Sequence, residues 1–214
     1  MTNSEVARSR NVTGNQLAWK LRLQVPAALR APADGYLKLK ASGTSVMYYI
    51  AYGSNLHPLR LILRVPSARL VGVAKLQGCR LTFHKRSNDG SSKCNLDFSN
   101  DPEHTTHVAV YDIPEADIPL LDRAEGLGQG YDKSQMTIEV DGSQLLAFVY
   151  LASSTHLTAN LEPYDWYKRL VLAGALKHKF PDAYIEQITM VASTQDLDEK
   201  RRLENENLLA QLEA

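Results

Sequence analysis

The segment from Tyr48 to Leu56, which reads YYIAYGSNL, constrains the fold of this chain more than any other stretch. Its apolar, aromatic run is typical of a buried β-strand, and the run stops at a Gly-Ser-Asn turn. Gly53 has no Cβ, so backbone N–H groups at the turn can approach a ligand closely. Ser54 and Asn55 are suitable N-cap residues for a following helix, whose positive end favours an anion. The sequence therefore predicts a seat for a carboxylate or an oxyanion, although such turns also occur for structural reasons alone.

From residue 47 onward, strand-like and helix-like segments follow one another closely. We expect strands near 47–52, 70–76, 80–85, 94–98, 107–111, 136–140 and 144–151, and helices near 56–64, 117–125 and 166–175, from 181 and over 196–209. Asp141-Gly142 is a hairpin signal between the last two strands. Because the strands come mostly before the helices, the pattern predicts an α+β domain over residues 47–195, followed by a charged C-terminal helix over 196–214.

Residues 1–46 differ in composition from the rest of the chain. They carry seven Lys and Arg against two Asp and Glu, a difference of +5, and their apolar residues show little periodicity. Such a segment buries little surface, so we expect a disordered or dispensable N-terminal extension. A transit peptide is the alternative, because the segment is rich in Arg and poor in acids.

Charge and cysteine content narrow the class of function. The formal net charge is zero, which gives no electrostatic case for binding nucleic acid or a membrane surface. Cys79 and Cys94 are the only cysteines, without a CxxC pair or a His/Cys cluster of metal-ligand spacing. Because no signal-peptide h-region precedes them, we expect structural, reduced thiols in a cytoplasmic protein. We also expect a monomer or homodimer with neither metal nor cofactor.

Glu125 is the second candidate site residue. It falls in the last turn of a short predicted helix that starts at Asp117 and Pro119, and Gly126 supplies a natural C-terminal cap. The negative end of the helix dipole disfavours ionisation of a carboxyl group there, and apolar neighbours such as Leu121 and Leu127 would add desolvation. A carboxyl group so placed suits proton transfer near neutral pH, although a solvated helix end is the simpler interpretation.

Several segments resemble the γ-glutamylcyclotransferase family in the same order along the chain. They are YIAYGSNL (49–56), LRVPSA (63–68), AKLQ (74–77), LTF (81–83), LDRAEG (121–126), Tyr150-Leu151 and the run from Trp166 to Ala175. The resemblance spans about residues 47–188, and YGSN with the Glu-Gly step is its most specific part. It implies a small curled mixed β-sheet or barrel with flanking helices.

The resemblance also implies a reaction and a set of site residues. The γ-glutamyl group of a small-molecule γ-glutamyl substrate would cyclise to 5-oxoproline, as in glutathione metabolism, with Glu125 as general acid and base. The substrate-binding residues would be Tyr52, Gly53, Ser54, Asn55, Leu56, Tyr131 and Tyr150. For Tyr131 and Tyr150 a role in core packing is an equal alternative, and Tyr48, Tyr49 and Ile50 are expected in the core. The alternatives are a specialised γ-glutamyl-amine or acyl substrate, and a non-catalytic module that binds small metabolites.

The basic string His84-Lys85-Arg86 closes a predicted strand and enters a polar loop. It departs from the pattern of the animal family members. Its side chains either reach an anionic part of the substrate or form an ordinary solvated strand end.

Overall fold

The computed structural model describes residues 38–39, 45–99 and 101–213. Its main sheet has the order β3-β6-β2-β8-β7, and β1 (Lys38–Leu39) pairs with β2 (Ser45–Ala51) off this path. The remaining strands of the sheet are β3 (Arg69–Gln77), β6 (Thr105–Pro114), β7 (Tyr131–Val140) and β8 (Ser143–Ala152). All pairings are antiparallel except β2 with β8, which are parallel, so the sheet is mixed.

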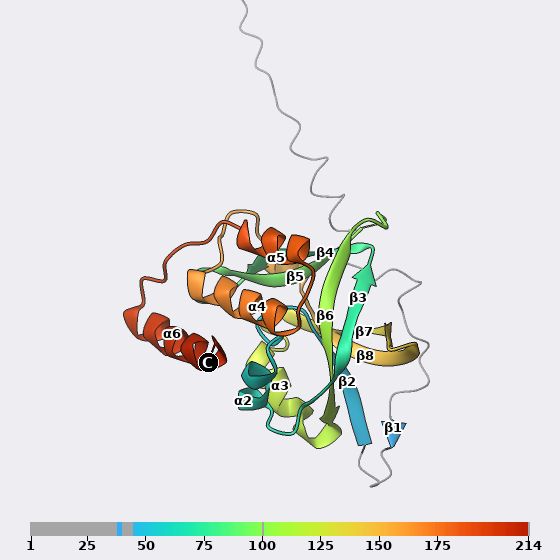
Figure 1. Cartoon of the computed structure of the whole chain (residues 1–214). Coiled ribbons are helices and arrows are strands. Elements are labelled where there is room, and N and C mark those ends of the chain that lie inside the picture. Colours follow the sequence, from blue (N-terminus) through green and yellow to red (C-terminus); the bar gives the residue numbers. More distant parts are fainter. Residues whose placement is uncertain (1–37, 40–44, 100, 214) are drawn as a thin grey trace, which may run out of the picture.

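The sheet curls into a half-barrel (Figure 1). Its two end strands, β3 and β7, contact each other across the curl. Gly72 follows a register shift in β3, and a Cβ added there would lie 2.7 Å from Cγ1 of Val140. A β-bulge bends a strand, and the absent side chain lets the two strand ends approach. The predicted α+β fold with a curled mixed sheet is therefore confirmed.

The remaining elements cover the half-barrel. The two-stranded hairpin β4 (Cys79–Arg86) and β5 (Ser92–Phe98) lies beside α4 (Asp165–Lys177) and α5 (Asp182–Thr189) in Figure 1. Two short helices, α2 (Pro58–Arg64) and α3 (Ile118–Glu125), lie together near one end of the sheet. The 3₁₀ turns η2 (Glu115–Asp117) and η3 (Ser154–His156) precede α3 and follow β8.

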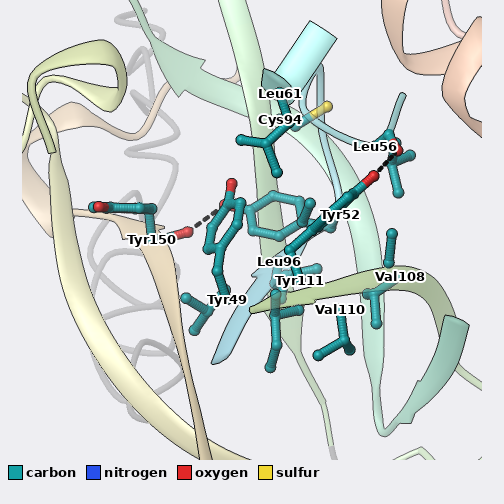
Figure 2. Packing of buried hydrophobic residues seen from close by; sticks show 14 of the residues in the cluster. Tyr49, Tyr52, Leu56, Leu61, Cys94, Leu96, Val108, Val110, Tyr111 and Tyr150 are labelled. Atoms are coloured by element: carbon teal, nitrogen blue, oxygen red, sulfur yellow. Dashed lines mark hydrogen bonds between the residues drawn. The ribbon is translucent and has the colours of Figure 1, made fainter. Parts of the chain in front are cut away.

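Local sequence explains why these elements form. The turn between β7 and β8 has positive φ at Asp141 (49°) and Gly142 (75°), the combination that a tight hairpin turn needs. Gly126 ends α3 in the left-handed conformation, with φ of 67°, as predicted. Both faces of the sheet are covered, because Tyr111 and Phe148 are buried on one face and Ile50 on the other, and Figure 2 shows part of the core packing.

The two ends of the chain differ from the predicted division in detail. The first core strand begins at Ser45 rather than residue 47, and Val46 is already buried. The other residues of the predicted extension, 1–37 and 40–44, lie outside the described residues. At the other end, α6 (Glu199–Glu213) packs against α4 and buries Leu209 and Leu212. Within the described ranges, none of the helices has the length and apolar character needed to cross a membrane.

Candidate functional site

A small pocket opens where β2 ends in the predicted turn. Its lining combines the turn, the predicted carboxylate and several tyrosines. The lining residues are Tyr49, Tyr52, Gly53, Ser54, Asn55, Cys94, Glu125, Tyr131, Tyr150 and Tyr167. The structure thus brings together every predicted site residue except Leu56.

Glu125 is held in this pocket by one of its two carboxylate oxygens. Oε1 accepts a hydrogen bond from Nδ2 of Asn55 (2.7 Å) and another from the Arg64 guanidinium (3.1 Å). The same guanidinium donates to Oδ1 of Asn55 (2.9 Å), and Nδ2 of Asn55 also donates to the Tyr49 hydroxyl (3.2 Å). Within the described part of the chain, Oε2 of Glu125 accepts no hydrogen bond. One oxygen is therefore fixed and the other is available to a ligand.

The surroundings of this carboxylate differ from the apolar ones that were predicted. Leu121 is fully buried, as expected, but Leu127 is 39% exposed and does not line the pocket. The closest partners of Glu125 are instead an amide and a guanidinium. The reason is the position of α2, which sets Arg64 beside the end of α3.

The turn itself also differs from the prediction. Helix α2 begins at Pro58 with His57 as its N-cap and without a side-chain cap, so Ser54 and Asn55 do not cap it. The chain first makes a separate turn, closed by the Leu56 amide donating to the Gly53 carbonyl (2.9 Å), and Asn55 uses its side chain on Glu125. The prediction that the positive end of the following helix favours an anion at this turn is therefore wrong.

The backbone of the turn nevertheless remains suited to an anion. Among the hydrogen bonds of the described residues, none is donated by the backbone amides of Gly53, Ser54 or Asn55. A Cβ at Gly53 would lie 3.1 Å from Cβ of Cys94 and 3.3 Å from the Tyr167 hydroxyl. Gly53 is thus needed for close packing of the pocket wall as well as for access to the backbone.

Leu56 does not reach the pocket. Its side chain is fully buried, and its carbonyl accepts hydrogen bonds from the Tyr111 hydroxyl (2.7 Å) and from Nε2 of His178 (2.7 Å). The bond from Tyr111 is visible in Figure 2. Leu56 therefore anchors the turn to the core instead of contacting a ligand through its side chain.

Three of the five tyrosine hydroxyls of the pocket are hydrogen-bonded to the backbone. Tyr52 donates to the carbonyl of Tyr150 (2.5 Å), and Tyr131 donates to the carbonyl of Cys94 (2.5 Å). Tyr167 accepts from the Cys94 amide (3.1 Å). Burial is the main cause that raises the pKa of Tyr52, Tyr131 and Tyr167 well above its ordinary value. These hydroxyls stay protonated at neutral pH and form an uncharged wall.

Tyr150 connects the pocket to a second carboxylate. Its hydroxyl donates to Oδ1 of Asp122 (2.5 Å), which is paired with Lys133 (2.7 Å). Burial and, after it, this hydrogen bond raise the pKa of Tyr150. Tyr150 is therefore both a core residue and a lining residue, as is Tyr131.

The two cysteines are free and buried, as expected. Burial raises the pKa of the Cys79 thiol to about 11 and that of Cys94 to about 12. Neither thiol is activated as a nucleophile. Cys94 nevertheless lines the pocket, which the sequence did not indicate. In the described part of the chain, no group of three His, Cys, Asp or Glu side chains is placed to hold a metal ion.

Sequence reasoning missed four contributors to the site, namely Arg64, Tyr49, Tyr167 and Cys94. Tyr49 was expected in the core and is buried there, but its hydroxyl also contacts Asn55. Arg64 ends the helix that follows the turn, and a search for a cation within one helix length of YGSN would have found it. Tyr167 and Cys94 come from distant elements and carry no comparable signal.

The pocket is small in this conformation. Its free volume is about 20 Å³, which is close to the space that one water molecule needs. A ligand the size of a glutamyl group requires side chains of the lining to move, as rotamer changes on binding commonly allow.

These features define a class of protein, an α+β half-barrel with one carboxylate in a tyrosine-lined pocket for a small molecule. The AIG2-like family matches residues 105–188 of the chain. The γ-glutamylcyclotransferase of Bos taurus is 26% identical over 154 residues, which cover 70% of this chain and 80% of that protein.

Solved structures agree with this match. A γ-glutamyl cyclotransferase superimposes with a TM-score of 0.65 and 26% identity, covering 78% of this chain and 99% of that one. An uncharacterised protein from Homo sapiens superimposes with a TM-score of 0.63 and 26% identity, covering 77% and 98%. The chain is thus distantly similar, at about 26% identity, to γ-glutamylcyclotransferases, and residues 105–188 match the AIG2-like family.

Proposed function

We propose that this protein cyclises the γ-glutamyl group of a γ-glutamyl amino acid or amine, releasing 5-oxoproline and the free amine. The observation that carries the proposal is the position of Glu125. One of its oxygens is held by Asn55 and Arg64, and the other is free in the pocket that the turn also lines. The distant similarity to γ-glutamylcyclotransferases supports the same class of reaction.

The reaction needs a proton carrier above all. The α-amine of the glutamyl group attacks its own γ-carbonyl carbon, a C–N bond closes the five-membered lactam, and the bond to the leaving nitrogen breaks. The α-amine is protonated at neutral pH, so Oε2 of Glu125 first accepts a proton from it. Glu125 then returns this proton to the departing nitrogen, which leaves as a neutral amine, and takes the second proton that the ring nitrogen must lose to become the lactam N–H. That second proton finally passes to solvent or to the released amine, so protons and bonds balance.

The rest of the pocket supplies charge stabilisation and confinement. The unpartnered amides of Gly53, Ser54 and Asn55 are suitable donors to negative charge on the glutamyl unit, including the oxyanion of the tetrahedral intermediate. The tyrosine wall restricts the substrate to folded conformers that bring the amine onto the carbonyl. Such restriction can lower the barrier to a cyclisation by several kcal/mol.

Product analysis tests the proposal directly. The purified protein is incubated with a panel of γ-glutamyl amino acids, γ-glutamyl amines and glutathione, and 5-oxoproline is measured by mass spectrometry. We expect equal amounts of 5-oxoproline and released amine from at least one member of the panel. The preferred leaving group separates an amino-acid substrate from a specialised amine or acyl substrate. If none yields 5-oxoproline, the cyclisation is excluded for this range of substrates. The hypothesis of a non-catalytic module that binds small metabolites is then favoured.

A further inference from the structure

Lys85 is a cation beside the pocket that the proposed reaction does not use. It lies on β4, its residue is only 7% exposed, and Nζ sits 4.7 Å from the centre of the Tyr131 ring. The end of its side chain packs over Gly130. A Cβ added to that glycine would lie only 2.9 Å from Cε and 3.0 Å from Nζ of Lys85. The ammonium group is thus fixed at the loop that joins Glu125 to Tyr131.

This ammonium group has no acceptor within the described residues. Neither a hydrogen bond nor an ion pair involves its Nζ, and the Tyr131 ring is its closest identified partner. Lys93 on the neighbouring strand is also largely buried but pairs with Asp89 (2.7 Å) and with the Ser91 hydroxyl (2.6 Å). A largely buried lysine is normally paired or hydrogen-bonded, and a cation–π contact compensates only in part for lost hydration. Nζ of Lys85 is not among the fully enclosed polar atoms of the described residues that lack a hydrogen bond, so a ligand can reach it. The position of Lys85 therefore suits binding of an anionic group of a ligand.

The position of Lys85 indicates which part of a ligand it meets. Lys85 does not line the pocket itself but lies behind one lining residue, Tyr131. In the proposed reaction, the glutamyl unit occupies the lined space next to Glu125 and the turn amides. An anion at Lys85 must then belong to the part of the substrate that extends past Tyr131, which is the leaving group.

The neighbours of Lys85 in the basic string do not share this arrangement. His84 contacts Nδ2 of Asn95 through Nε2 (2.9 Å), and Arg86 is exposed and donates to the Thr155 carbonyl (2.9 Å). Adjacent residues of a strand face opposite sides, so Arg86 is a matched cation on the other side of β4.

We propose that Lys85 binds a carboxylate of the leaving group, so that the substrates are γ-glutamyl amino acids or peptides rather than simple γ-glutamyl amines. This inference rests on the proposed cyclisation and names its substrate class. Burial lowers the pKa of Lys85, but a carboxylate beside Nζ would favour the charged form and form a charge-assisted hydrogen bond.

The kinetic test compares two substrates that differ only by a carboxylate, γ-glutamylalanine and γ-glutamylethylamine. Lys85→Met should lower kcat/KM for γ-glutamylalanine about tenfold or more, and leave γ-glutamylethylamine within about twofold. Arg86→Met, the matched control, should change neither substrate. Equal losses for both substrates with Lys85→Met, or no loss for either, would overturn the assignment of Lys85. Lys85→Gln, checked for native circular dichroism, replaces Lys85→Met if that variant does not fold.

A binding measurement separates this inference from the proposed reaction. Calorimetric titration in a Glu125→Gln background, which prevents turnover, should show that γ-glutamylalanine binds more tightly than γ-glutamylethylamine. Adding Lys85→Met should remove that preference. If wild-type protein forms no 5-oxoproline from either compound but the preference and its loss are observed, the reaction fails and the anion subsite stands. If the preference survives in Lys85→Met, the subsite fails whether or not the reaction occurs.

Discussion

Asn55 and Glu125, 70 residues apart in the chain, are joined by a hydrogen bond of 2.7 Å between Nδ2 and Oε1. The bond links the turn after β2 to the last turn of α3. Arg64 closes the arrangement by donating to both side chains. The turn and the carboxylate thus form one unit at the pocket, and each of them orients the other.

Replacing Glu125 by Gln should abolish turnover while leaving substrate binding intact. The amide keeps the size of the side chain but cannot exchange a proton, and general acid–base groups contribute roughly 10²- to 10⁴-fold to rate. The measurement is 5-oxoproline formation, together with calorimetric binding of a γ-glutamyl compound. Glu139→Gln, on an exposed position of β7, is the control and should behave as wild type. Activity retained by Glu125→Gln would remove Glu125 from the mechanism.

Replacing Arg64 by Met should reduce kcat more than it changes KM. Arg64 is a positioning residue, because it holds Oε1 of Glu125 and Oδ1 of Asn55 at once. Misplacing a catalytic group by about 1 Å can cost roughly 100-fold, so we expect a loss of 10- to 100-fold in kcat. Arg64→Lys keeps the charge and should recover part of the rate. A variant with unchanged kcat would show that Asn55 alone positions the carboxylate.

Replacing Gly174 by Ala should destabilise the protein although Ala is the better helix former. A Cβ at this position of α4 would lie 2.3 Å from Cβ of Leu56 and 2.8 Å from the amide nitrogen of His57. Overpacking of this kind costs about 1–3 kcal/mol, against a gain of about 1 kcal/mol in helix propensity. The free energy of unfolding, measured by chemical denaturation, should therefore fall.

The Gly174 variant also tests the role of Leu56. If the turn depends on its anchor in the core, Gly174→Ala should lower kcat as well as stability, because Leu56 and the turn must shift away from α4. A stable variant with wild-type activity would mean that the backbone at Leu56 moves without disturbing the pocket.

Local patterns in the sequence predict the elements of the fold well but not their mutual contacts. The β-branched and aromatic runs, the Asp141-Gly142 hairpin and the cap at Gly126 act within a few residues, and the structure shows each of them. The predicted start of the helix after the turn is too early. The side chain of Asn55 donates a hydrogen bond to Glu125 and does not cap α2.

In the candidate site, too, residues in local motifs are predictable from the sequence, and residues that join the site through packing are not. Gly53 and Glu125 stand in short motifs that sequence reasoning can identify. The cation at Arg64 and the hydroxyl of Tyr167 join the site only because α2 and α4 pack beside it, and no local pattern encodes that packing. The unpaired state of Lys85 is likewise a property of the three-dimensional neighbourhood.

Asp196 provides a pH-dependent contribution to stability at the junction of α4 and α6. Its buried carboxylate accepts hydrogen bonds from Nε1 of Trp166 (2.9 Å) and from Nε of Arg201 (2.6 Å). The hydrogen bonds from Arg201 are the main cause that lowers the pKa of Asp196 from 3.8 to about 2. A lowered pKa means that the folded state favours the ionised form, so the stabilisation is fully present above about pH 4. It disappears as the pH falls through about 2.

Asp196→Asn should accordingly lower the free energy of unfolding at pH 7 by about 2 kcal/mol, because each unit of pKa shift corresponds to about 1.4 kcal/mol. The difference from wild type should shrink when chemical denaturation is repeated at pH 3 and should approach zero near pH 2, where Asp196 itself becomes neutral. Asp198→Asn is the control, since its half-exposed carboxylate lies 3.4 Å from Arg201 and such surface pairs contribute at most about 1 kcal/mol. A difference between Asp196→Asn and wild type that is independent of pH would mean that shape and packing at this junction, rather than the charge, account for the loss.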